Sequence, residues 1–321
     1  MKSKVGIIGL GWFGSFHLEQ LLTMNDVEVV ALCTANTERL EKAHKKVPDA
    51  KCFSHHKEMF DEMALDAVYV CVTPSRHEDI ELIAAEKRIA MYIEKPIGAW
   101  YIDEVMKKER KILESKVICS VGYQERYSDL VDVIRNWLKE ETPVSIRGKW
   151  MDTMPETPWW RQMKLSGGQV TEQATHIIDM MRFLWGEIEV EQSLGIKGYL
   201  QHPNYDVVDA SITLLRFPSG MLGTLECGCY LDKSQTPDIG IEIQGISSKL
   251  IYRWQQEVII TKGEKEEVYT QTDSSHYRSS RRFVDAIKEQ NQSLILSDYT
   301  DARKTLETTI KISEEMEIKD K

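Results

Sequence analysis

The chain contains 321 residues, of which 42% are hydrophobic and 29% are charged, which is typical of a folded globular protein and excludes a disordered or fibrous one. This length favours two domains with an apolar core that needs no disulfide or metal for stability. The 51 acidic residues outnumber the 41 basic ones, and the formal net charge of -10 argues against nucleic acid or an anionic membrane as the main partner.

The cysteines and the N-terminus both favour a cytoplasmic protein. Four of the six cysteines lie in apolar, strand-like runs, as reduced core thiols do. Cys227 and Cys229 have strand spacing, so both face one side, and core packing is favoured over a metal or redox role. No metal site is expected, because no His/Cys group has zinc-like spacing. Lys2 and Lys4 precede an apolar run over 5–16, but four glycines interrupt it, and no stretch approaches the ~20 apolar residues of a membrane-spanning helix.

The first third of the chain alternates apolar, strand-like runs with helical segments. The predicted strands cover residues 5–9, 27–32, 67–72, 89–93 and 117–121. The predicted helices cover 17–23, 38–46 and 78–87. Continuous apolar strands separated by helices predict a parallel sheet covered on both faces.

After about residue 122 the pattern changes to a long series of strands flanked by helices. The predicted helices cover 130–138, 170–185, 280–289 and 300–316, and a strand covers 144–150. From 188 to 260 strand follows strand, and Pro218-Ser219-Gly220 joins two of them in a predicted hairpin. We therefore predict a doubly wound α/β domain over residues 1–121, followed by an α+β domain with an open, largely antiparallel sheet over 122–321.

A glycine motif follows the first predicted strand and opens the first helix: Gly9-Leu10-Gly11-Trp12-Phe13-Gly14. This context indicates the dinucleotide-binding turn of a Rossmann domain. There Gly9 permits the tight turn, Gly11 lets a pyrophosphate approach, and Gly14 lets helix and strand pack closely. The helix N-terminus, with Trp12 and Phe13, then faces the phosphates. The alternative is a glycine-rich turn without a ligand, which its place at the start of a βαβ repeat disfavours.

The ribose-reading position lies about 20 residues beyond such a turn, which here is near Thr34. NAD enzymes usually carry an acidic residue there, and residues 31–37 contain none. Thr34, Asn36 and Arg39 would instead donate hydrogen bonds to a 2′-phosphate, so NADP is favoured and NAD stays possible. Thr34 or Asn36 would also cap the next helix, and the two roles are compatible.

Four further motifs follow in order along the chain. They are Val72-Thr73-Pro74-Ser75-Arg76-His77, then Glu94-Lys95-Pro96, then Gly122-Tyr123-Gln124-Glu125-Arg126, and finally the segment from Gly167 to Asp179. Each is weak alone, but with the glycine motif they span the chain in sequence. Together they resemble the glucose–fructose oxidoreductase/inositol dehydrogenase (Gfo/Idh/MocA) family.

The resemblance implies a Rossmann domain, a nicotinamide cofactor, a sugar- or polyol-like substrate, and oligomers formed through the second domain's sheet. It implies that Lys95 contacts both nicotinamide and substrate and that His176 is the acid/base residue. It implies further cofactor contacts at Thr73, Pro74, His77 and Glu94, and a cis peptide before Pro96. Glu172 and Ala174 replace the family's usual Asp and Gly, which leaves the shape of the pocket open. Relatives with incomplete motifs carry out other reactions or only bind ligands, so chemistry does not follow from the fold.

On the predicted helix over 170–185, Glu172 and His176 are four residues apart, so their side chains are expected to be neighbours. A carboxylate beside an imidazole stabilises its protonated form and fixes its orientation. Helix geometry alone favours a simple surface pair, whereas the Gly-Gly entry and the ordered motifs favour a catalytic one.

Lys95 follows a buried strand at its carboxyl end, where ligands bind in open α/β sheets. The alternatives are a solvated lysine or an ion pair with Glu94, and His77 would alternatively cap a helix or pack. Oxidation of an alcohol sends a hydride to nicotinamide, and its proton needs a base with a pKa near the operating pH, a requirement that the histidine side chain fits. Lys95 would stabilise the developing alkoxide.

Candidate substrate contacts lie just before and on the Gly-Gly helix. Trp159 and Trp160, with Trp150, would stack on sugar rings, with core or interface packing as the equal alternative. Arg161 would bind a hydroxyl pair or a carboxylate. Polar contacts are expected from Tyr123, Gln124, Arg126, Gln169 and Gln173.

We therefore expect an NAD(P)-dependent dehydrogenase or reductase, with NADP favoured, that acts on a sugar, polyol or related cyclic alcohol or carbonyl. The alternative is a non-catalytic dinucleotide-binding sensor or regulator on the same fold, which the presence of both Lys95 and His176 disfavours. Leu214-Leu215 and Leu250-Ile251 place apolar residues on both faces of the late strands. This predicts a homodimer or homotetramer built on the C-terminal sheet.

Overall fold

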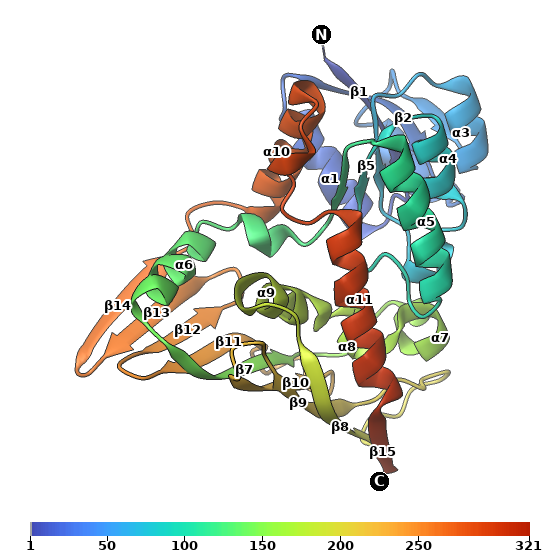
Figure 1. Ribbon diagram of the computed structural model, residues 1–321. Helices are drawn as coiled ribbons and strands as arrows, with labels where there is room; N and C mark the ends of the chain where they lie inside the picture. The colour runs from blue at the N-terminus through green and yellow to red at the C-terminus, as the bar shows by residue number, and fades with distance from the viewer. Residues whose placement is uncertain (1) are drawn as a thin grey trace. The chain divides into compact units, whose positions relative to one another are not determined.

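The computed structural model describes residues 2–321 and forms two compact units (Figure 1). Unit 1 contains the chain up to Tyr123 together with His276–Arg303. Unit 2 contains Gln124–Ser275 together with Lys304–Lys321. The chain passes from unit 1 to unit 2 after Tyr123, close to the expected domain boundary at residue 121. Residues 276–303 belong to unit 1, whereas the sequence analysis placed them in the second domain.

Unit 1 is built on a parallel sheet of six strands in the order β3-β2-β1-β4-β5-β6, which is the order of a Rossmann fold. The strands are β1 (Ser3–Ile8), β2 (Val27–Cys33), β3 (Lys51–Phe53), β4 (Ala67–Val70), β5 (Ala90–Ile93) and β6 (Cys119–Val121). The helices are α1 (Trp12–Leu22), α2 (Thr37–His44), α3 (His56–Glu62), α4 (Ile80–Glu86), α5 (Ile102–Ser115) and α10 (Ser275–Glu289). The predicted doubly wound parallel sheet is confirmed.

The strands of unit 1 form because apolar runs are buried on both faces, and every residue of β4 and β5 is buried. Helices α1 and α10 lie on one side of the strands, and α4 and α5 lie on the other (Figure 1). The core on the first side joins Ile7 and Tyr69 of the strands to Leu18 of α1 and Phe283 of α10. Helix α1 and its glycine turn are thereby fixed against the sheet.

Helix α10 returns to unit 1 because its apolar face completes this core. Phe283, Ala286 and Ile287 are buried at helical spacing. The Phe283 ring lies 5.6 Å from each of the Tyr69 and Tyr92 rings, measured between centroids. Periodicity predicts a buried helix face, but it does not identify the sheet that buries it.

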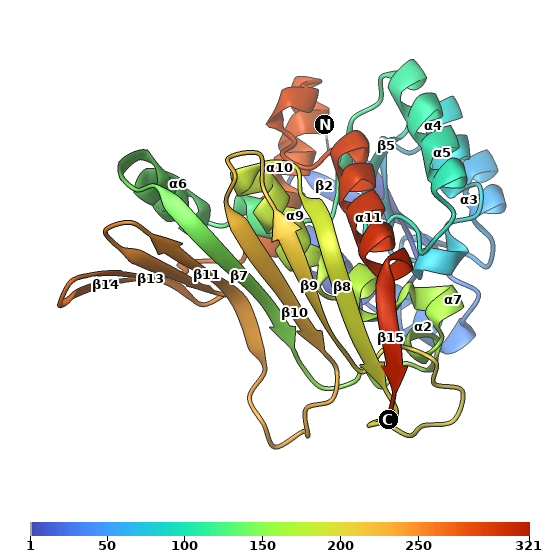
Figure 2. The same ribbon diagram turned by 60° about the horizontal axis from the view of Figure 1, so that its bottom comes forward.

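Unit 2 centres on a nine-stranded sheet in the order β14-β13-β12-β11-β7-β10-β9-β8-β15 (Figure 2). The strands are β7 (Pro143–Met151), β8 (Glu189–Lys197), β9 (Ala210–Arg216), β10 (Leu222–Gly228), β11 (Asp238–Gly245), β12 (Lys249–Arg253), β13 (Glu257–Lys262), β14 (Lys265–Thr270) and β15 (Met316–Asp320). Most neighbours are antiparallel, whereas β7 pairs with β10 and β8 with β15 in parallel. The predicted largely antiparallel sheet is confirmed, as is the hairpin of β9 and β10.

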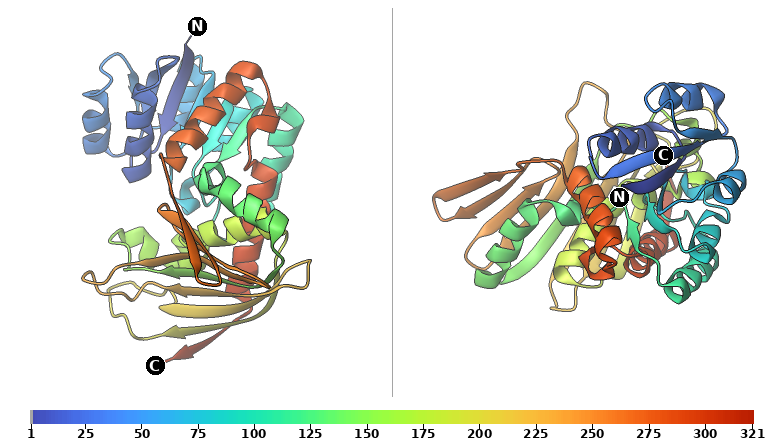
Figure 3. Two further views of the ribbon diagram at one scale, coloured as in Figure 1. Left: turned by 90° about the vertical axis from the view of Figure 1, so that its left-hand side faces the viewer. Right: turned by 90° about the horizontal axis from the view of Figure 1, so that it is seen from above.

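The helices of unit 2 cover one face of this sheet. They are α6 (Leu130–Glu140), α7 (Met163–Ser166), α8 (Gly168–Glu172), α9 (Thr175–Trp185) and α11 (Tyr299–Glu314), which begins in unit 1. Their core includes Ile134 of α6, Ile177 and Met181 of α9, and Leu225 and Ile243 of the sheet. Within unit 2, no helix lies against the opposite sheet face (Figure 3, left).

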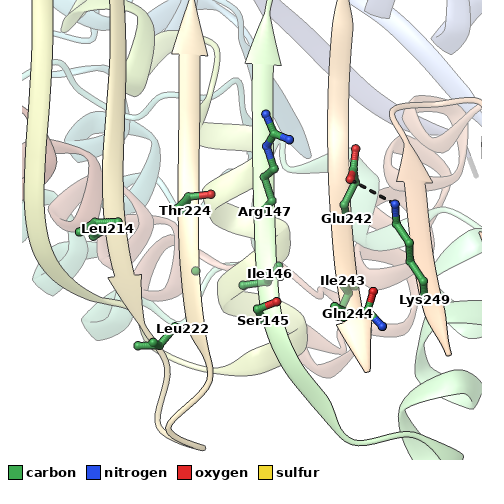
Figure 4. A pocket seen from close by; sticks show the side chains of 11 residues that line it. Ser145, Ile146, Arg147, Leu214, Leu222, Thr224, Glu242, Ile243, Gln244 and Lys249 are labelled. Carbon is green, nitrogen blue, oxygen red and sulfur yellow. Dashed lines mark ion pairs between the residues drawn. The ribbon is translucent and has the colours of Figure 1, made fainter. Parts of the chain in front are cut away.

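The uncovered sheet face carries apolar side chains. Ile212 and Leu214 of β9 and Leu222 of β10 are 51%, 46% and 52% exposed. Leu214 and Leu222 border a shallow depression of about 400 Å³ that crosses β9, β10, β7, β11 and β12 (Figure 4). On its rim Lys249 pairs with Glu242 at 3.5 Å.

The single helix predicted over 170–185 is wrong, because the chain forms two helices there. Helix α8 ends at Glu172 and α9 begins at Thr175. The amide of His176 donates to the carbonyl of Gln173 at 3.3 Å, three residues back, so the regular ladder is not continuous. The four-residue spacing of Glu172 and His176 therefore does not by itself make their side chains neighbours.

All six cysteines carry free thiols, and Cys227 and Cys229 are buried. Within the described part of the chain, no helix combines the length and the apolar character required to cross a bilayer.

Candidate functional site

The glycine-rich turn after β1 has the geometry that the motif predicts. Gly9 has a φ of +88°, and a Cβ on it would come within 2.3 Å of the carbonyl oxygen of Cys71. A Cβ on Gly14 would lie 1.9 Å from the carbonyl oxygen of Gly9, so only glycine allows α1 to approach this closely. A Cβ on Gly11 would meet only Nη1 of Arg39 within 4 Å, at 3.8 Å. The backbone at Gly11 is therefore open to an approaching group.

Helix α1 begins directly beside this open backbone. Gly11 is its N-cap, and no described side chain caps the first turn. Uncapped amide groups and the positive end of the helix dipole suit a phosphate, so the turn fits the pyrophosphate of a dinucleotide. Trp12 is 73% exposed and stacks flat on Phe16 at a centroid distance of 5.7 Å. Phe13 stacks on His276 of α10 at 6.0 Å.

The chain after β2 forms the capped N-terminus of α2, and Arg39 of this helix extends toward the glycine turn. Asn36 Oδ1 accepts a hydrogen bond from the Arg39 amide at 2.9 Å, and Thr34 Oγ1 accepts one from the Asn36 amide at 3.3 Å. Asn36 therefore caps α2, one of the two alternatives of the sequence analysis, whereas Thr34 bonds only the amide of this capping residue. The exposed Arg39 reaches back toward Gly11, which places a guanidinium beside the open turn.

The loop after β4 carries Thr73 and a short 3-10 turn at Pro74–Arg76. His77 beyond it is buried, and its Nδ1 donates to Glu81, whose second oxygen pairs with Lys108 at 3.0 Å. Burial opposes ionisation of Glu81, but His77 and Lys108 hold the pKa of Glu81 below its ordinary value. These contacts give His77 the packing role that was its alternative interpretation.

Lys95 lies at the carboxyl edge of the sheet, two residues beyond the end of β5, and is partly buried. The Lys95–Pro96 peptide is cis, as the resemblance implied. Glu94 uses its Oε1 to accept a hydrogen bond from His17 Nε2 at 2.7 Å, so its closest described partner is this histidine. Burial opposes ionisation of Glu94, but His17, followed by Lys95 and His276, holds the pKa of Glu94 below its ordinary value.

Sequence analysis missed His17 and His276. A signal existed for His17, because it follows Gly14 by three residues and so lies on the sheet-facing side of the phosphate helix. No signal existed for His276, because the helix that carries it was assigned to the other domain.

In unit 2, His176 lies in an aromatic niche near the start of α9. Its ring is stacked on Trp150 of β7 at 5.6 Å, with an interplanar angle of 16°. Trp254, between β12 and β13, lies 4.8 Å from it at 60°. The niche buries His176 to 6% exposure. Trp254 was missed because a single aromatic residue at a hairpin turn carries no periodic pattern.

Two neighbours of His176 each bury a polar atom that has no hydrogen-bond partner among the described residues. These atoms are Trp150 Nε1 and Gln173 Oε1. Buried polar atoms are nearly always paired, so an unpaired donor and an unpaired acceptor on these two residues suit a ligand that carries hydroxyl groups. Gln169 is engaged, because its Nε2 donates to the Trp150 carbonyl at 3.2 Å.

The tryptophans before α8 are largely structural. Trp160 is buried with Val207 and Cys229, and Trp159 packs at the edge of this cluster. Trp160 Nε1 donates to Glu172 Oε2 at 2.9 Å. These contacts support the packing alternative for Trp160. Arg161 is partly buried, and its Nε lacks a described hydrogen-bond partner.

The segment with Tyr123, Gln124 and Arg126 is buried. Arg126 donates two hydrogen bonds to Asp179, from Nε at 2.7 Å and from Nη2 at 2.6 Å. Its guanidinium also lies 4.7 Å from the Phe183 ring centroid. This bidentate pair gives Arg126 a structural role that its motif position did not predict.

A further group of polar side chains gathers beside α3. The side-chain atoms of His55, His56 and Glu78 that could bind a metal ion lie within 4.8 Å of one another. His56 Nε2 donates to Asp79 at 2.7 Å, and His55 Nδ1 accepts from the Lys57 amide at 3.3 Å. Both imidazoles thus have protein partners, and local structure explains the group.

Known proteins resemble this chain over both units. The family described as "Oxidoreductase family, NAD-binding Rossmann fold" matches residues 3–123, and the "GFO/IDH/MocA C-terminal domain" matches residues 142–251. Myo-inositol 2-dehydrogenase of Thermotoga maritima is 27% identical over 232 residues, which are 70% of this chain and 67% of that protein. The chain thus matches about two thirds of the length of this relative.

Solved structures share the fold at lower identity. Levoglucosan dehydrogenase in complex with NADH has a TM-score of 0.86 at 19% identity, covering 98% of this chain and 97% of that chain. A 3-ketoreductase from Actinomadura kijaniata in complex with NADP and TDP-benzene has a TM-score of 0.87 at 15% identity, covering 100% of both chains. At these identities the likeness shows the fold alone. The two family matches, in chain order and on the two units described above, show that the chain belongs to the Gfo/Idh/MocA family of oxidoreductases.

Proposed function

We propose that the protein is an NADP-preferring oxidoreductase that transfers a hydride between the nicotinamide and a sugar, polyol or related cyclic alcohol or carbonyl. The observation that carries the proposal is His176, packed against two indole rings, together with an unpaired donor on Trp150 and an unpaired acceptor on Gln173. The names of the relatives, an inositol dehydrogenase and a levoglucosan dehydrogenase, support the same substrate class.

Each catalytic residue has one role in this proposal. His176 takes the hydroxyl proton in oxidation and returns it in reduction. Lys95 stabilises negative charge on the reacting oxygen. The nicotinamide, when bound, accepts or supplies the hydride.

The substrate class follows from the niche around His176. Aromatic faces pack well against the apolar faces of cyclic sugars and polyols. Trp150 Nε1 would donate to one substrate oxygen, and Gln173 Oε1 would accept from one substrate hydroxyl. A substrate without hydroxyl groups would leave both atoms buried and unpaired, which is unfavourable.

The preference for NADP rests on charge. Residues 31–37 contain no carboxylate that would repel a 2′-phosphate, and Arg39 brings a guanidinium toward the glycine turn. Arginine binds phosphate oxygens in a planar, bidentate manner, so Arg39 is the residue we assign to the 2′-phosphate.

The test is a screen of inositols, anhydrosugars, monosaccharides and acyclic polyols with NADP and NAD, in both directions. We expect at least one substrate to change the absorbance of the reduced nicotinamide, with the larger kcat/KM for NADP. The control is Gly11→Asp, which fits the open space at an N-cap and stabilises the helix start while repelling a pyrophosphate. Tight dinucleotide binding without turnover on the whole panel would contradict the proposal and favour a sensor.

A further inference from the structure

A buried histidine–glutamate pair joins the glycine-rich helix to the strand end that carries Lys95. His17 lies on α1, three residues beyond Gly14, and none of its surface is exposed. Glu94 directly precedes Lys95, and its carboxylate accepts a hydrogen bond from His17 Nε2 at 2.7 Å. The pair therefore spans two parts of unit 1 that we assign to the same cofactor.

The ring of His17 is fixed on every side. Its Nδ1 lies 3.4 Å from Ser280 Oγ of α10, within the range of a hydrogen bond. The ring packs against Tyr69 of β4 and Tyr92 of β5, with centroid distances of 5.2 and 5.1 Å. Each ring nitrogen has a partner, so the direction of the Nε2–H group is set before any ligand arrives.

The carboxylate of Glu94 is equally confined. A Cβ on Gly122 would come within 3.0 Å of both carboxylate oxygens. The Glu94 amide donates to the Val70 carbonyl at 2.9 Å, and the Gly122 amide donates to the Ile93 carbonyl at 2.8 Å. The strand end and its carboxylate are therefore held together, and Lys95 starts from a fixed backbone position.

Stability alone does not account for such a pair. A buried, hydrogen-bonded polar pair usually contributes no more to stability than apolar side chains of similar volume. The core of unit 1 around the pair contains Ile7, Leu18 and Tyr69, so apolar and aromatic side chains already stabilise this part of the sheet. The distinctive feature of the pair is its location, between the uncapped helix start and Lys95.

We propose that His17 and Glu94 are positioning residues that hold Lys95 in register with a dinucleotide bound at the glycine-rich turn. The inference rests on the proposed cofactor and is independent of which substrate is used. A charge-assisted hydrogen bond is short and directional, so it transmits the position of α1 to the end of β5. Neither residue needs to contact the cofactor.

The test compares His17→Ala, Glu94→Ala, the double variant and Glu94→Gln in the full-length protein. The matched control is Glu109→Gln, which removes another buried carboxylate of unit 1, one that pairs with Arg303 at 2.8 Å. Four quantities are measured: the dissociation constant of the reduced dinucleotide, the fluorescence of its bound nicotinamide, turnover, and Tm.

We expect both alanine variants to lose turnover by ~10- to 100-fold, because small displacements of a reacting group have effects of this size. Their bound nicotinamide should fluoresce differently from that of the wild type. The dissociation constant should change by less than ~3-fold, since the glycine turn and Arg39 are untouched. Turnover of the double variant should be no lower than that of the less active single variant, because the pair acts as a unit. Glu94→Gln keeps an acceptor for His17 and should recover most of the turnover.

Two outcomes would overturn the inference. One is that the alanine variants lower only Tm, as expected of Glu109→Gln, and leave fluorescence and turnover at wild-type values. The other is that their effects on turnover add in the double variant. Absence of dinucleotide binding by the wild-type protein would instead overturn the proposed function, and this inference with it.

Discussion

Arg39 is the single residue on which the choice of cofactor depends. Its amide closes the capping hydrogen bond of α2, while its guanidinium extends toward Gly11. The backbone interaction survives truncation of the side chain, so Arg39→Ala removes the charge and leaves the cap in place. This separation makes the residue a clean probe of 2′-phosphate recognition.

We expect Arg39→Ala to weaken NADP binding by ~10- to 100-fold, the size of a lost hydrogen bond to a charged group, and to change NAD binding by less than ~2-fold. Titration calorimetry with both dinucleotides measures this directly. Lys42→Ala, an exposed cation on the same helix, is the control and should change neither affinity. Tighter binding of NAD than NADP to the wild type would contradict the assignment.

His276 makes stability depend on pH. Burial lowers the pKa of His276 to about 4 from an ordinary value of 6.5, although the carboxylate of Glu94 acts in the opposite direction. The unfolded chain therefore binds the proton more tightly than the folded one. The contribution of neutral His276 to the free energy of unfolding is complete above pH 6.5 and is lost as the pH falls toward about 4.

We expect the free energy of unfolding of the wild type to fall between pH 7 and pH 4.5 more steeply than that of His276→Gln. The difference reaches at most ~3 kcal/mol, because a tenfold change in proton affinity corresponds to ~1.4 kcal/mol. Urea titrations at several pH values measure both slopes. His202→Gln, at an exposed histidine, should keep the wild-type slope. Parallel slopes for His276→Gln and the wild type would show that His276 titrates normally.

At the scale of elements, most of the buried strands and the phosphate turn could be predicted, whereas the break between α8 and α9 and the edge strand β15 could not. The continuous apolar runs of β4 and β5 predict buried strands. The position of the glycine motif between a strand and a helix predicts the phosphate turn. The break between α8 and α9 falls at Gln173 and Ala174, neither of which breaks helices, so only tertiary packing reveals it. Strand β15 was missed because its exposed, polar residues pair in parallel with the edge strand β8.

Helix α10 shows the same limit, because its buried face is evident in sequence while its partner sheet is not. Phe283→Ala should lower the free energy of unfolding by ~3–5 kcal/mol, since loss of a fully buried ring packed against Tyr69 and Tyr92 leaves a cavity. Denaturant titration measures the loss. Arg282→Ala, the exposed neighbour, should change stability by less than ~0.5 kcal/mol. A loss for Phe283→Ala no larger than that of the control would contradict the packing described for α10.

At the scale of the whole molecule, the open face of the nine-stranded sheet is the feature that a monomer does not explain. Exposed apolar side chains lie on the neighbouring strands β9 and β10, and apolar surfaces of this kind mark interfaces. This supports the prediction of a homodimer or homotetramer through the C-terminal sheet, with a second copy of the chain as the covering partner.

We expect light scattering to give the mass of two or four chains for the wild type, and of one chain for Leu222→Lys at the same micromolar concentration. A lysine at this position would place like charges opposite each other in a symmetric interface, which is unfavourable. Leu113→Lys, at an exposed leucine on α5, is the control and should leave the mass unchanged. A wild-type protein that is monomeric at this concentration would contradict the prediction.

The most direct test of the central claim is the turnover of His176→Ala with any accepted substrate at saturating dinucleotide. We predict a loss of ~100- to 10,000-fold, the usual contribution of general acid–base catalysis, with the dinucleotide dissociation constant nearly unchanged because His176 belongs to unit 2. Retention of most of the wild-type turnover by His176→Ala would contradict the assignment of His176 as the residue that moves the proton.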